Sequence, residues 1–287
     1  VSAGTDISVG SVMALVASCC CTSLVGYGVS SASAVKHPII FGVLFGIFIG
    51  GICGCFNGFM VSKLKVQPMV ATLVLYTAAR AIGLVVSNNQ ITYVRVKEYK
   101  YLGNFWHIGN WECPIPTPIF VAIICVILAT ILLKKTALGM YIQAVGINPK
   151  AARIMGINSA LIIFICYVIC GLGAGVAGTV ASSRIYSADS NNIGLNFEMD
   201  AILAVALGGN SLAGGKFSLA GSIIGAYTIQ ALSTTLLAFG VKTEQAPVIK
   251  AIVIIIIVAI QAPAIQSYIK NRKARKASAT GGEAVAK

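Results

Sequence analysis

Charge is scarce in this sequence, and its scarcity excludes a water-soluble globular protein. Of the 287 residues, 10% are Asp, Glu, Lys or Arg, while 57% are hydrophobic. Soluble domains average about 25% charged residues. With so few charges the chain cannot cover a water-facing surface, so lipid must cover much of it. The sequence therefore predicts an integral membrane protein.

Acidic residues and histidines are scarcer still, which argues against an enzyme and against a metal site. The chain has 21 Lys and Arg, eight Asp and Glu, and two histidines, His37 and His107, which both fall in predicted loops. No Ser/His pair, HExxH motif or Walker pattern is present, so we expect neither catalysis nor ATP hydrolysis by this chain. Eight of the nine cysteines lie in apolar segments, as small buried hydrophobic residues do.

The apolar segments predict an all-α, polytopic transmembrane helical bundle. A helix needs about 20 apolar residues to cross the hydrocarbon core, and about eight segments approach that length. They are roughly 9–29, 38–61, 68–86, 117–133, 159–181, 198–209, 218–239 and 246–262. The sixth is short and ends at Gly208 and Gly209, which predicts a broken helix lining a pathway.

The basic residues predict the orientation of the bundle and argue against a nucleic-acid partner. The net charge of +13 resides at the ends of apolar runs, as topology signals do. If the spans alternate, these residues share the cytoplasmic side: Lys63, Lys65, Lys134, Lys135, Lys150, Arg153, Lys216, Lys270, Arg272, Lys273, Arg275 and Lys276. Segments 30–37, 87–116, 182–197 and 240–245 then lie outside. Residues 1–269 form one membrane domain, and 270–287 form a basic, then disordered, cytoplasmic tail.

The outer segment 87–116 is rich in aromatic residues, which leaves two interpretations open. It contains Tyr93, Tyr99, Tyr101, Trp106 and Trp111. Such residues commonly form an interfacial belt at headgroup level. The alternative is a contact with an extracytoplasmic partner.

Segment 144–157, AVGINPKAARIMGI, predicts a short docking helix in a cytoplasmic loop. Asn148 and Pro149 are typical of a helix start, and Gly156 is typical of a helix end. Between them, Ala151, Ala152 and Met155 share one face, and small residues allow close approach of a partner. A helix resting on lipid headgroups is the alternative, and that would need a bulkier apolar face.

Three motifs in this order resemble the sugar-type ABC importer permeases of the ribose/xylose/galactose family. They are GTDISVGS at 4–11, AVGINPKAARIMGI at 144–157 and LGGNSLAGGK at 207–216. Segments SADSNNIG at 187–194 and KTALGM at 135–140 look most like galactofuranose importer permeases. Phe217 and Thr5 are minor departures from the family pattern.

The resemblance implies a non-catalytic permease subunit that forms a translocation path for a monosaccharide, galactofuranose, galactose or a ribose-like sugar. It implies a multi-pass protein of the bacterial plasma membrane with a cytoplasmic C-terminus. Its partners would be a cytoplasmic ATPase that binds ATP and Mg²⁺, a second permease and an extracytoplasmic sugar-binding protein. The chain starts at Val1 directly before the first motif, so two upstream spans are expected to be missing from about ten.

The resemblance also assigns the predicted docking helix to coupling with the ATPase. The coupling residues would be Gly146, Asn148, Ala151, Ala152, Arg153 and Gly156. A secondary, ion-coupled transporter is the alternative function. It would need acidic residues at the membrane midplane, and few acids fall there.

Polar side chains in or next to the predicted spans fall into two predicted groups. Candidates for a weakly binding solute path are Asn57, Asp189, Asn191 and Asn192. Asp6, Arg80, Asp200 and Lys250 are expected to be structural, because an unpaired charge at membrane depth costs at least about 2.5 kcal/mol. We expect Arg80 or Lys250 to pair with Asp200 or Glu198, and Asp6 to lie inside the bundle.

Overall fold

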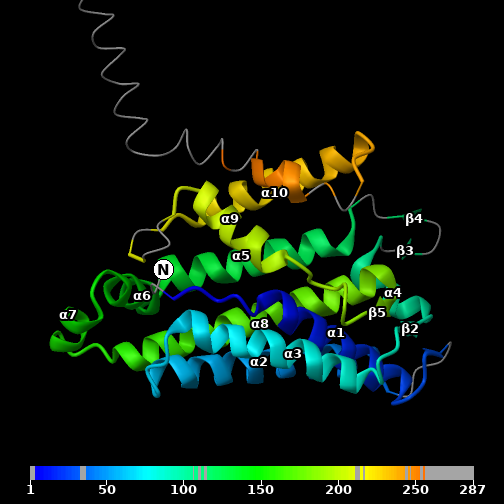
Figure 1. Cartoon of the computed structure of the whole chain (residues 1–287), viewed down its shortest axis with the longest axis horizontal. Coiled ribbons are helices and arrows are strands. Elements are labelled where there is room, and N and C mark those ends of the chain that lie inside the picture. Colours follow the sequence, from blue (N-terminus) through cyan, green and yellow to red (C-terminus); the bar gives the residue numbers. More distant parts are fainter. Residues whose placement is uncertain are drawn as a thin grey trace, which may run out of the picture. The chain divides into compact units, whose positions relative to one another are not determined.

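The fold is seen in a computed structural model that describes residues 4–32, 37–105, 107–108, 111–112, 115–210, 214–215, 217–242, 245, 247–252 and 255. The chain divides into two compact units. The first comprises Val1–Met199 and Ser211–Phe217, and the second comprises Asp200–Asn210 and Ser218–Lys287. Helices make up most of the described chain (Figure 1), which confirms the predicted all-α class.

Helices occupy seven of the eight predicted spans. They are α1 (Val9–Val25), α2 (Ile39–Ser62), α3 (Pro68–Val86), α5 (Thr117–Lys135), α8 (Ser159–Ile185), α9 (Phe197–Leu207) and α10 (Leu219–Ala238). By length and composition, α2, α3, α5 and α8 are able to cross a membrane, while α1 is apolar but shorter. The eighth span is helical at 247–252, and most of it, like the tail 270–287, lies outside the described residues.

The remaining elements are short and lie in predicted loops. They are α4 (Lys97–Gly103), α6 (Ala137–Ile147), α7 (Pro149–Ile154), β1 (Ser31–Ala32), β2 (Thr92–Val94), β3 (His107–Ile108), β4 (Trp111–Glu112) and β5 (Ser187–Ala188). Strands β3 and β4 form a two-stranded antiparallel pair. Helix α6 lies in the basic segment after the fourth span, where the sequence predicted the docking helix within 144–157 and no separate helix before it.

Helices α2 and α8 of the first unit lie side by side (Figure 1), and glycine sets their separation. Helix α2 has a glycine at every fourth position from Gly42 to Gly58. A Cβ added to Gly50 would lie 2.5 Å from the carbonyl oxygen of Gly171, and one added to Gly54 would lie 2.5 Å from that of Tyr167. The backbones therefore touch, because glycines one turn apart let two membrane helices approach closely.

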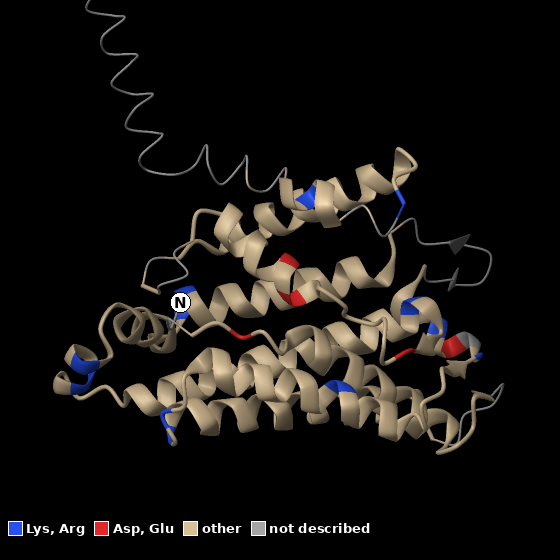
Figure 2. Ribbon diagram, viewed as in Figure 1, with Lys and Arg blue, Asp and Glu red and all other residues tan. Residues whose placement is uncertain are grey.

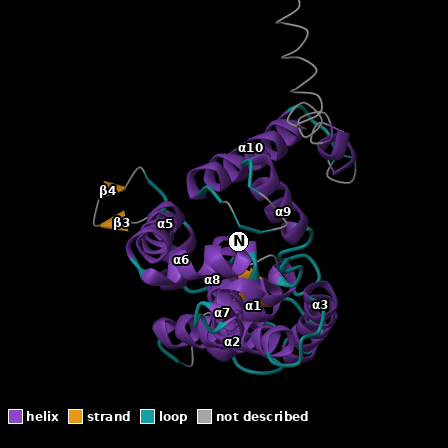
Figure 3. Cartoon of the chain, turned by 90° about the vertical axis from the view of Figure 1, so that its left-hand side faces the viewer, coloured by secondary structure: helices purple, strands orange, loops and turns teal. Residues whose placement is uncertain are grey.

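Helix α1 is the centre of the first unit and is surrounded by α2, α3 and α8 (Figure 3). Most of its residues are buried, including Cys19, Cys20 and Cys21. The prediction of buried cysteines is therefore confirmed for α1. It is wrong for Cys55 and Cys125, which are exposed on α2 and α5.

A small sheet joins three of the four segments that were predicted to lie outside the membrane. Strand β1 pairs in parallel with β2, and β2 pairs antiparallel with β5. The three strands come from the predicted outer segments 30–37, 87–116 and 182–197. These segments therefore meet at one end of the first unit, as the alternation of spans requires. Figure 2 shows most Lys and Arg of this unit near its loops, with few along the helices between.

Tyr99 is a correction to the predicted aromatic belt. Helix α4 packs on α8, and Tyr99 is fully buried with its hydroxyl 2.7 Å from Ser182 Oγ. Ser183 Oγ donates a hydrogen bond to the Tyr99 carbonyl. Burial raises the pKa of Tyr99 well above its ordinary value, so the phenol stays protonated. Trp106 and the side chain of Trp111 lie outside the described part of the chain.

The glycine contact between α2 and α8 makes Gly54→Ala a sharp test of the fold. The new Cβ would collide with the backbone of α8, so we expect a loss of about 1–3 kcal/mol. The apparent Tm of the purified protein in detergent should fall by several degrees. Gly173→Ala on α8 is the matched control, because its Cβ would meet no atom within 4 Å. Equal stability of the two variants would show that close backbone contact is not required.

Candidate functional site

Helix α7 has the boundaries that the sequence predicted. The Asn148 side-chain oxygen accepts hydrogen bonds from the backbone N–H groups of Lys150 at 3.0 Å and Ala151 at 3.1 Å. Pro149 occupies the first turn, where its missing N–H costs nothing. Gly156 follows the helix with a φ of +85°, in the left-handed region that favours glycine. The chain therefore fixes the length of this helix at both ends.

The orientation of α7 corrects the prediction of a small docking face. Ala152 is fully buried and packs with Ile142, Val145 and Ile162 of the same chain. In this structure Ala152 cannot touch a partner, and it instead lets α7 lie close to α6 and α8. Gly146 is also buried. The face predicted from Ala151, Ala152 and Met155 is thus divided between the interior and the surface.

Larger side chains occupy the exposed surface of α7. Ile154 is 88% exposed, Met155 is 69% exposed and Ile147 is 73% exposed. Arg153 and Lys150 are also exposed beside them. The sequence held a signal for this surface, because bulky apolar residues in a basic loop are costly in water unless a partner or the membrane surface covers them, and the bulkier face keeps both interpretations of the segment open.

Helix α7 is fastened to the start of α8. Ser159 Oγ donates a hydrogen bond to the Pro149 carbonyl at 2.9 Å. The Asn158 side chain caps α8 by accepting from the Leu161 N–H at 3.2 Å. Gly215 lies beside Ile147, so the third motif reaches the same end of the first unit. Any displacement of α7 must therefore be transmitted to the first turn of α8.

The predicted path residues after β5 form a constrained loop. Asp189 accepts hydrogen bonds from the Asn191 N–H at 2.9 Å and from the Asn192 side chain at 2.6 Å. Ser190 Oγ lies 2.5 Å from Ser18 Oγ of α1. Asp189 is half-buried, whereas Asn191 and Asn192 are exposed. The structure therefore brings these three predicted residues together.

Arg80 fixes the same loop from α3. Its guanidinium donates to the carbonyl oxygens of Ser190 and Asn191, both at 2.8 Å, and lies 5.8 Å from the ring centre of Tyr76. The sequence predicted that Arg80 or Lys250 would pair with an acidic residue, and Arg80 binds backbone carbonyls. Both bonds come from Nη1, while Nε and Nη2 are buried without a hydrogen-bond partner among the described residues. Arg80 is therefore structural, but it positions candidate path residues.

Asn57 lies apart from the other path candidates, beside Asp6. Its side-chain amide donates to Ser8 Oγ at 3.0 Å, and Asp6 accepts from the Ser8 N–H and hydroxyl at 2.9 and 2.7 Å. Asn57 is almost fully buried. The gap beside it, which Cys53 and Cys170 also line, is too narrow for a water molecule. This cluster places Asp6 inside the bundle, as expected.

Helices α1 and α9 begin close to each other. The backbones of Gly10 in α1 and Gly194 before α9 touch, and the buried Glu198 carboxylate lies against Gly10. A carboxylate there is favourable, because the N-terminus of a helix carries partial positive charge. Helix α9 then ends after 11 residues, before Gly209 with its φ of +76°. The predicted broken helix is confirmed.

Lys250 and Asp200 form the expected ion pair within the second unit. The Lys250 ammonium lies 2.8 and 3.0 Å from the two carboxylate oxygens of Asp200. Their side chains are 17% and 28% exposed, respectively. The pair lets both charges enter an apolar environment at lower cost.

A known family matches most of the sequence, including all three motifs. The family model described as "Branched-chain amino acid transport system / permease component" matches residues 1–258. The chain belongs to this family. It is therefore a multi-pass membrane permease of a transport system.

Curated relatives extend over most of the chain. The galactofuranose transporter permease protein YtfT of Escherichia coli K12 is 38% identical over 95% of this chain and 76% of its own length. The fructose import permease protein FruF of Bifidobacterium longum is 38% identical over 99% and 77%. The ribose import permease protein RbsC of E. coli K12 is 36% identical over 90% and 77%. No solved structure matches the chain.

The ion pair predicts that Asp200 is required for stability. Asp200→Asn and Lys250→Met each leave one partner uncompensated, which should cost up to about 3 kcal/mol in an apolar environment. The double variant removes both charges and should be closer to the wild type than either single variant. The measurement is the apparent Tm in detergent, with the exposed Lys242→Met as control. A double variant less stable than both single variants would contradict the pairing.

Proposed function

We propose that the chain is the transmembrane permease subunit of a binding-protein-dependent ABC importer for a monosaccharide. Galactofuranose or galactose, or a ribose-like sugar, is the proposed solute. The names of the relatives support a sugar, since they include galactofuranose, fructose and ribose permeases. The subunit itself catalyses no reaction, and its partner ATPase binds ATP and Mg²⁺.

The observation that carries this proposal is the exposed surface of α7. A helix of six residues is too short to be stable alone, yet this one is capped at Asn148 and seated by Ala152. It presents Ile154 and Met155 to solvent between Lys150 and Arg153. Apolar anchors with a basic rim fit a groove of a cytoplasmic ATPase. Gly146, Asn148, Ala151 and Gly156 then shape the helix, and Arg153 contacts the partner.

The contacts of α7 supply a mechanism for coupling. The Ser159–Pro149 hydrogen bond and the buried Ala152 tie α7 to α8. Helix α8 in turn touches α2 along its glycines, so these elements move together. Closure of the ATPase on ATP would pull α7, and the pull would reach the spans through α8. The switch between outward- and inward-open states is thus a rigid-body motion.

The loop after β5 is the proposed contact for the solute. Asn191 and Asn192 are exposed, and their amides can donate to and accept from sugar hydroxyl groups. Arg80 holds the loop through its carbonyls and leaves these amides available. A path needs weak contacts, because a tight site would retain the sugar. Asp189 serves this loop by orienting both asparagines.

The proposed assembly contains the permease, a second permease copy or relative, a cytoplasmic ATPase and an extracytoplasmic sugar-binding protein. It lies in the bacterial inner membrane with α7 and the C-terminus in the cytoplasm. The complex isolated from native membranes should catalyse ATP-dependent uptake of galactofuranose, galactose or a ribose-like sugar in proteoliposomes. Uptake driven by an ion gradient without ATP would refute the importer proposal and support a secondary transporter.

The exposure of Ile154 predicts an uncoupled variant. Ile154→Asp changes a side chain that is 88% exposed, so folding should be preserved. A charge at the buried centre of an interface costs several kcal/mol, so ATP-dependent uptake should fall at least about tenfold. Leu64→Asp, at another exposed residue of this end, is the matched control and should keep uptake. Ala152→Asp should instead disrupt the packing of α7 against α6 and α8 and lower the yield of folded protein.

A normal uptake rate for Ile154→Asp at normal expression would remove α7 from the interface. The amount of ATPase that copurifies with the permease provides a second measurement. It should fall for Ile154→Asp and remain unchanged for Leu64→Asp.

A further inference from the structure

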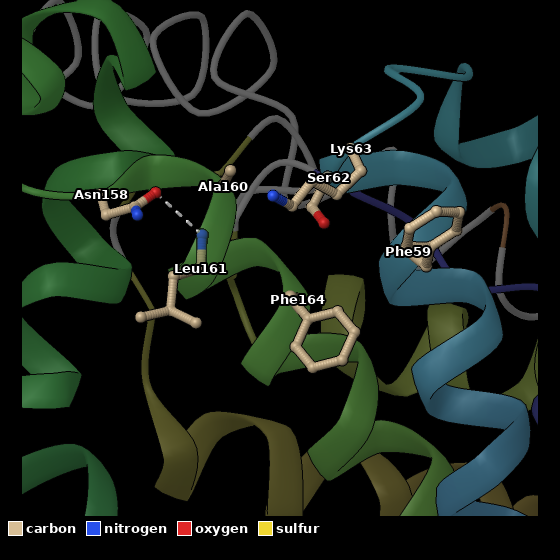
Figure 4. Close-up of a pocket in the computed structure, with 7 residues that line it drawn as sticks. All are labelled: Phe59, Ser62, Lys63, Asn158, Ala160, Leu161 and Phe164. Atoms are coloured by element: carbon tan, nitrogen blue, oxygen red, sulfur yellow. Dashed lines mark hydrogen bonds between the residues drawn. The ribbon is translucent and has the colours of Figure 1, made fainter.

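A groove separates the end of α2 from the start of α8, in the first unit. Its volume is about 280 Å³, and its walls include Phe59, Ser62 and Lys63 from α2 and Leu161 and Phe164 from α8. Figure 4 shows Ser62 and Lys63 opposite Asn158 in the upper part of the view, with Leu161 and Phe164 below them. The groove is thus polar at one edge and apolar in its depth.

The glycine contact explains why the groove occurs here. Gly58 is the last glycine of α2 that meets α8, where an added Cβ would lie 2.8 Å from the Phe164 ring. The next position of this row is Ser62, in the last turn of α2, where it lines the groove together with Phe59. Side chains rather than backbones then separate the two helices. The space between the helix ends is therefore a consequence of the same packing that holds them together.

The groove lies at the level of a membrane boundary. Helix α2 ends at Ser62 and α8 begins at Ser159, and both have the length and composition of membrane spans. Exposed apolar side chains continue from Phe59 along α2 at Phe56, Ile52 and Phe48. In a bilayer such a row would face the hydrocarbon, and the groove would then open at the junction of acyl chains and headgroups.

Charge selects the occupant. Lys63 contributes an exposed ammonium, Ser62 contributes a hydroxyl donor, and the residues that line the groove include neither Asp nor Glu. Basic pockets between membrane helices bind anionic lipid headgroups. The narrow volume fits one headgroup and the beginning of its acyl chains rather than a helix of another subunit.

We propose that this groove binds one anionic phospholipid. The phosphate accepts hydrogen bonds from the Lys63 ammonium and the Ser62 hydroxyl, and the acyl chains lie against Phe59, Leu161 and Phe164. The lipid bridges the ends of α2 and α8, next to the Asn158 cap and the Ser159 anchor of α7. It therefore stabilises the part of the bundle on which α7 is mounted.

The test measures lipid retention, which does not depend on the transported solute. The purified full chain is titrated with dioleoyl phosphatidylglycerol or dioleoyl phosphatidylcholine, which share their acyl chains. Bound lipid is counted by native mass spectrometry, and the apparent Tm is recorded. The wild type should retain one phosphatidylglycerol in preference and gain several degrees in Tm from it. Equal retention of the two lipids would overturn the proposal.

Two variants and one control locate the site. Lys63→Gln should weaken phosphatidylglycerol retention about fivefold, because one basic residue near the surface is lost. Lys65→Gln removes the same charge from the same loop without lining the groove, and should behave as the wild type. Ala160→Trp fills the groove and should abolish the preference while keeping the fold. Equal loss in both lysine variants would indicate diffuse surface charge and refute the site.

Two further outcomes would contradict the occupant. Inorganic phosphate that stabilises the wild type as well as the lipid does would identify a simple anion site. A dimer of this chain that Ala160→Trp dissociates, with no change in lipid retention, would identify the groove as a protein interface.

Discussion

The first unit depends on direct contact between the backbones of α2 and α8. Lipid is as apolar as the helix surfaces, so burial of apolar side chains gives little drive for two spans to associate. Dispersion contacts must take its place, and they weaken within an ångström of separation. The glycines of α2 remove the side chains that would hold α8 away. The position of α1, the packing of α7 against α8 and the groove beyond Gly58 all follow from that contact.

Within each unit several polar groups have a hydrogen-bond or ion-pair partner, while Arg80 Nε and Nη2 and Asn57 Oδ1 have none among the described residues. Arg80 uses loop carbonyls, Asn57 and Asp6 share Ser8, and Asp200 uses Lys250. Each arrangement lowers the cost of a polar group in an apolar setting. The bonds of Arg80 also decide where Asn191 stands. Structural polar groups and the proposed solute contacts are therefore neighbours rather than separate systems.

Sequence periodicity predicted the long helices, the cap at Asn148 and the glycine spacing, because these depend on local chemistry. It missed the burial of Ala152 and Tyr99, because a helical wheel shows which residues share a face but not what covers that face. It left open whether Arg80 or Lys250 pairs with an acidic residue, since the backbone carbonyls that bind Arg80 leave no pattern in the sequence. The sheet of β1, β2 and β5 is too short for any strand pattern.

The corrected orientation of α7 gives a stronger account of coupling than an exposed small-residue face. A coupling helix transmits a displacement only if its contacts with its own chain are stronger than its contacts with the partner. Ala152 lets α7 pack closely against α6 and α8, and the Ser159 hydroxyl ties Pro149 to the first turn of α8. The bulky Ile154 and Met155 then remain exposed for the proposed contact with an ATPase. The small residues of this segment thus pack α7 against its own chain, and the large residues form the proposed contact with the partner.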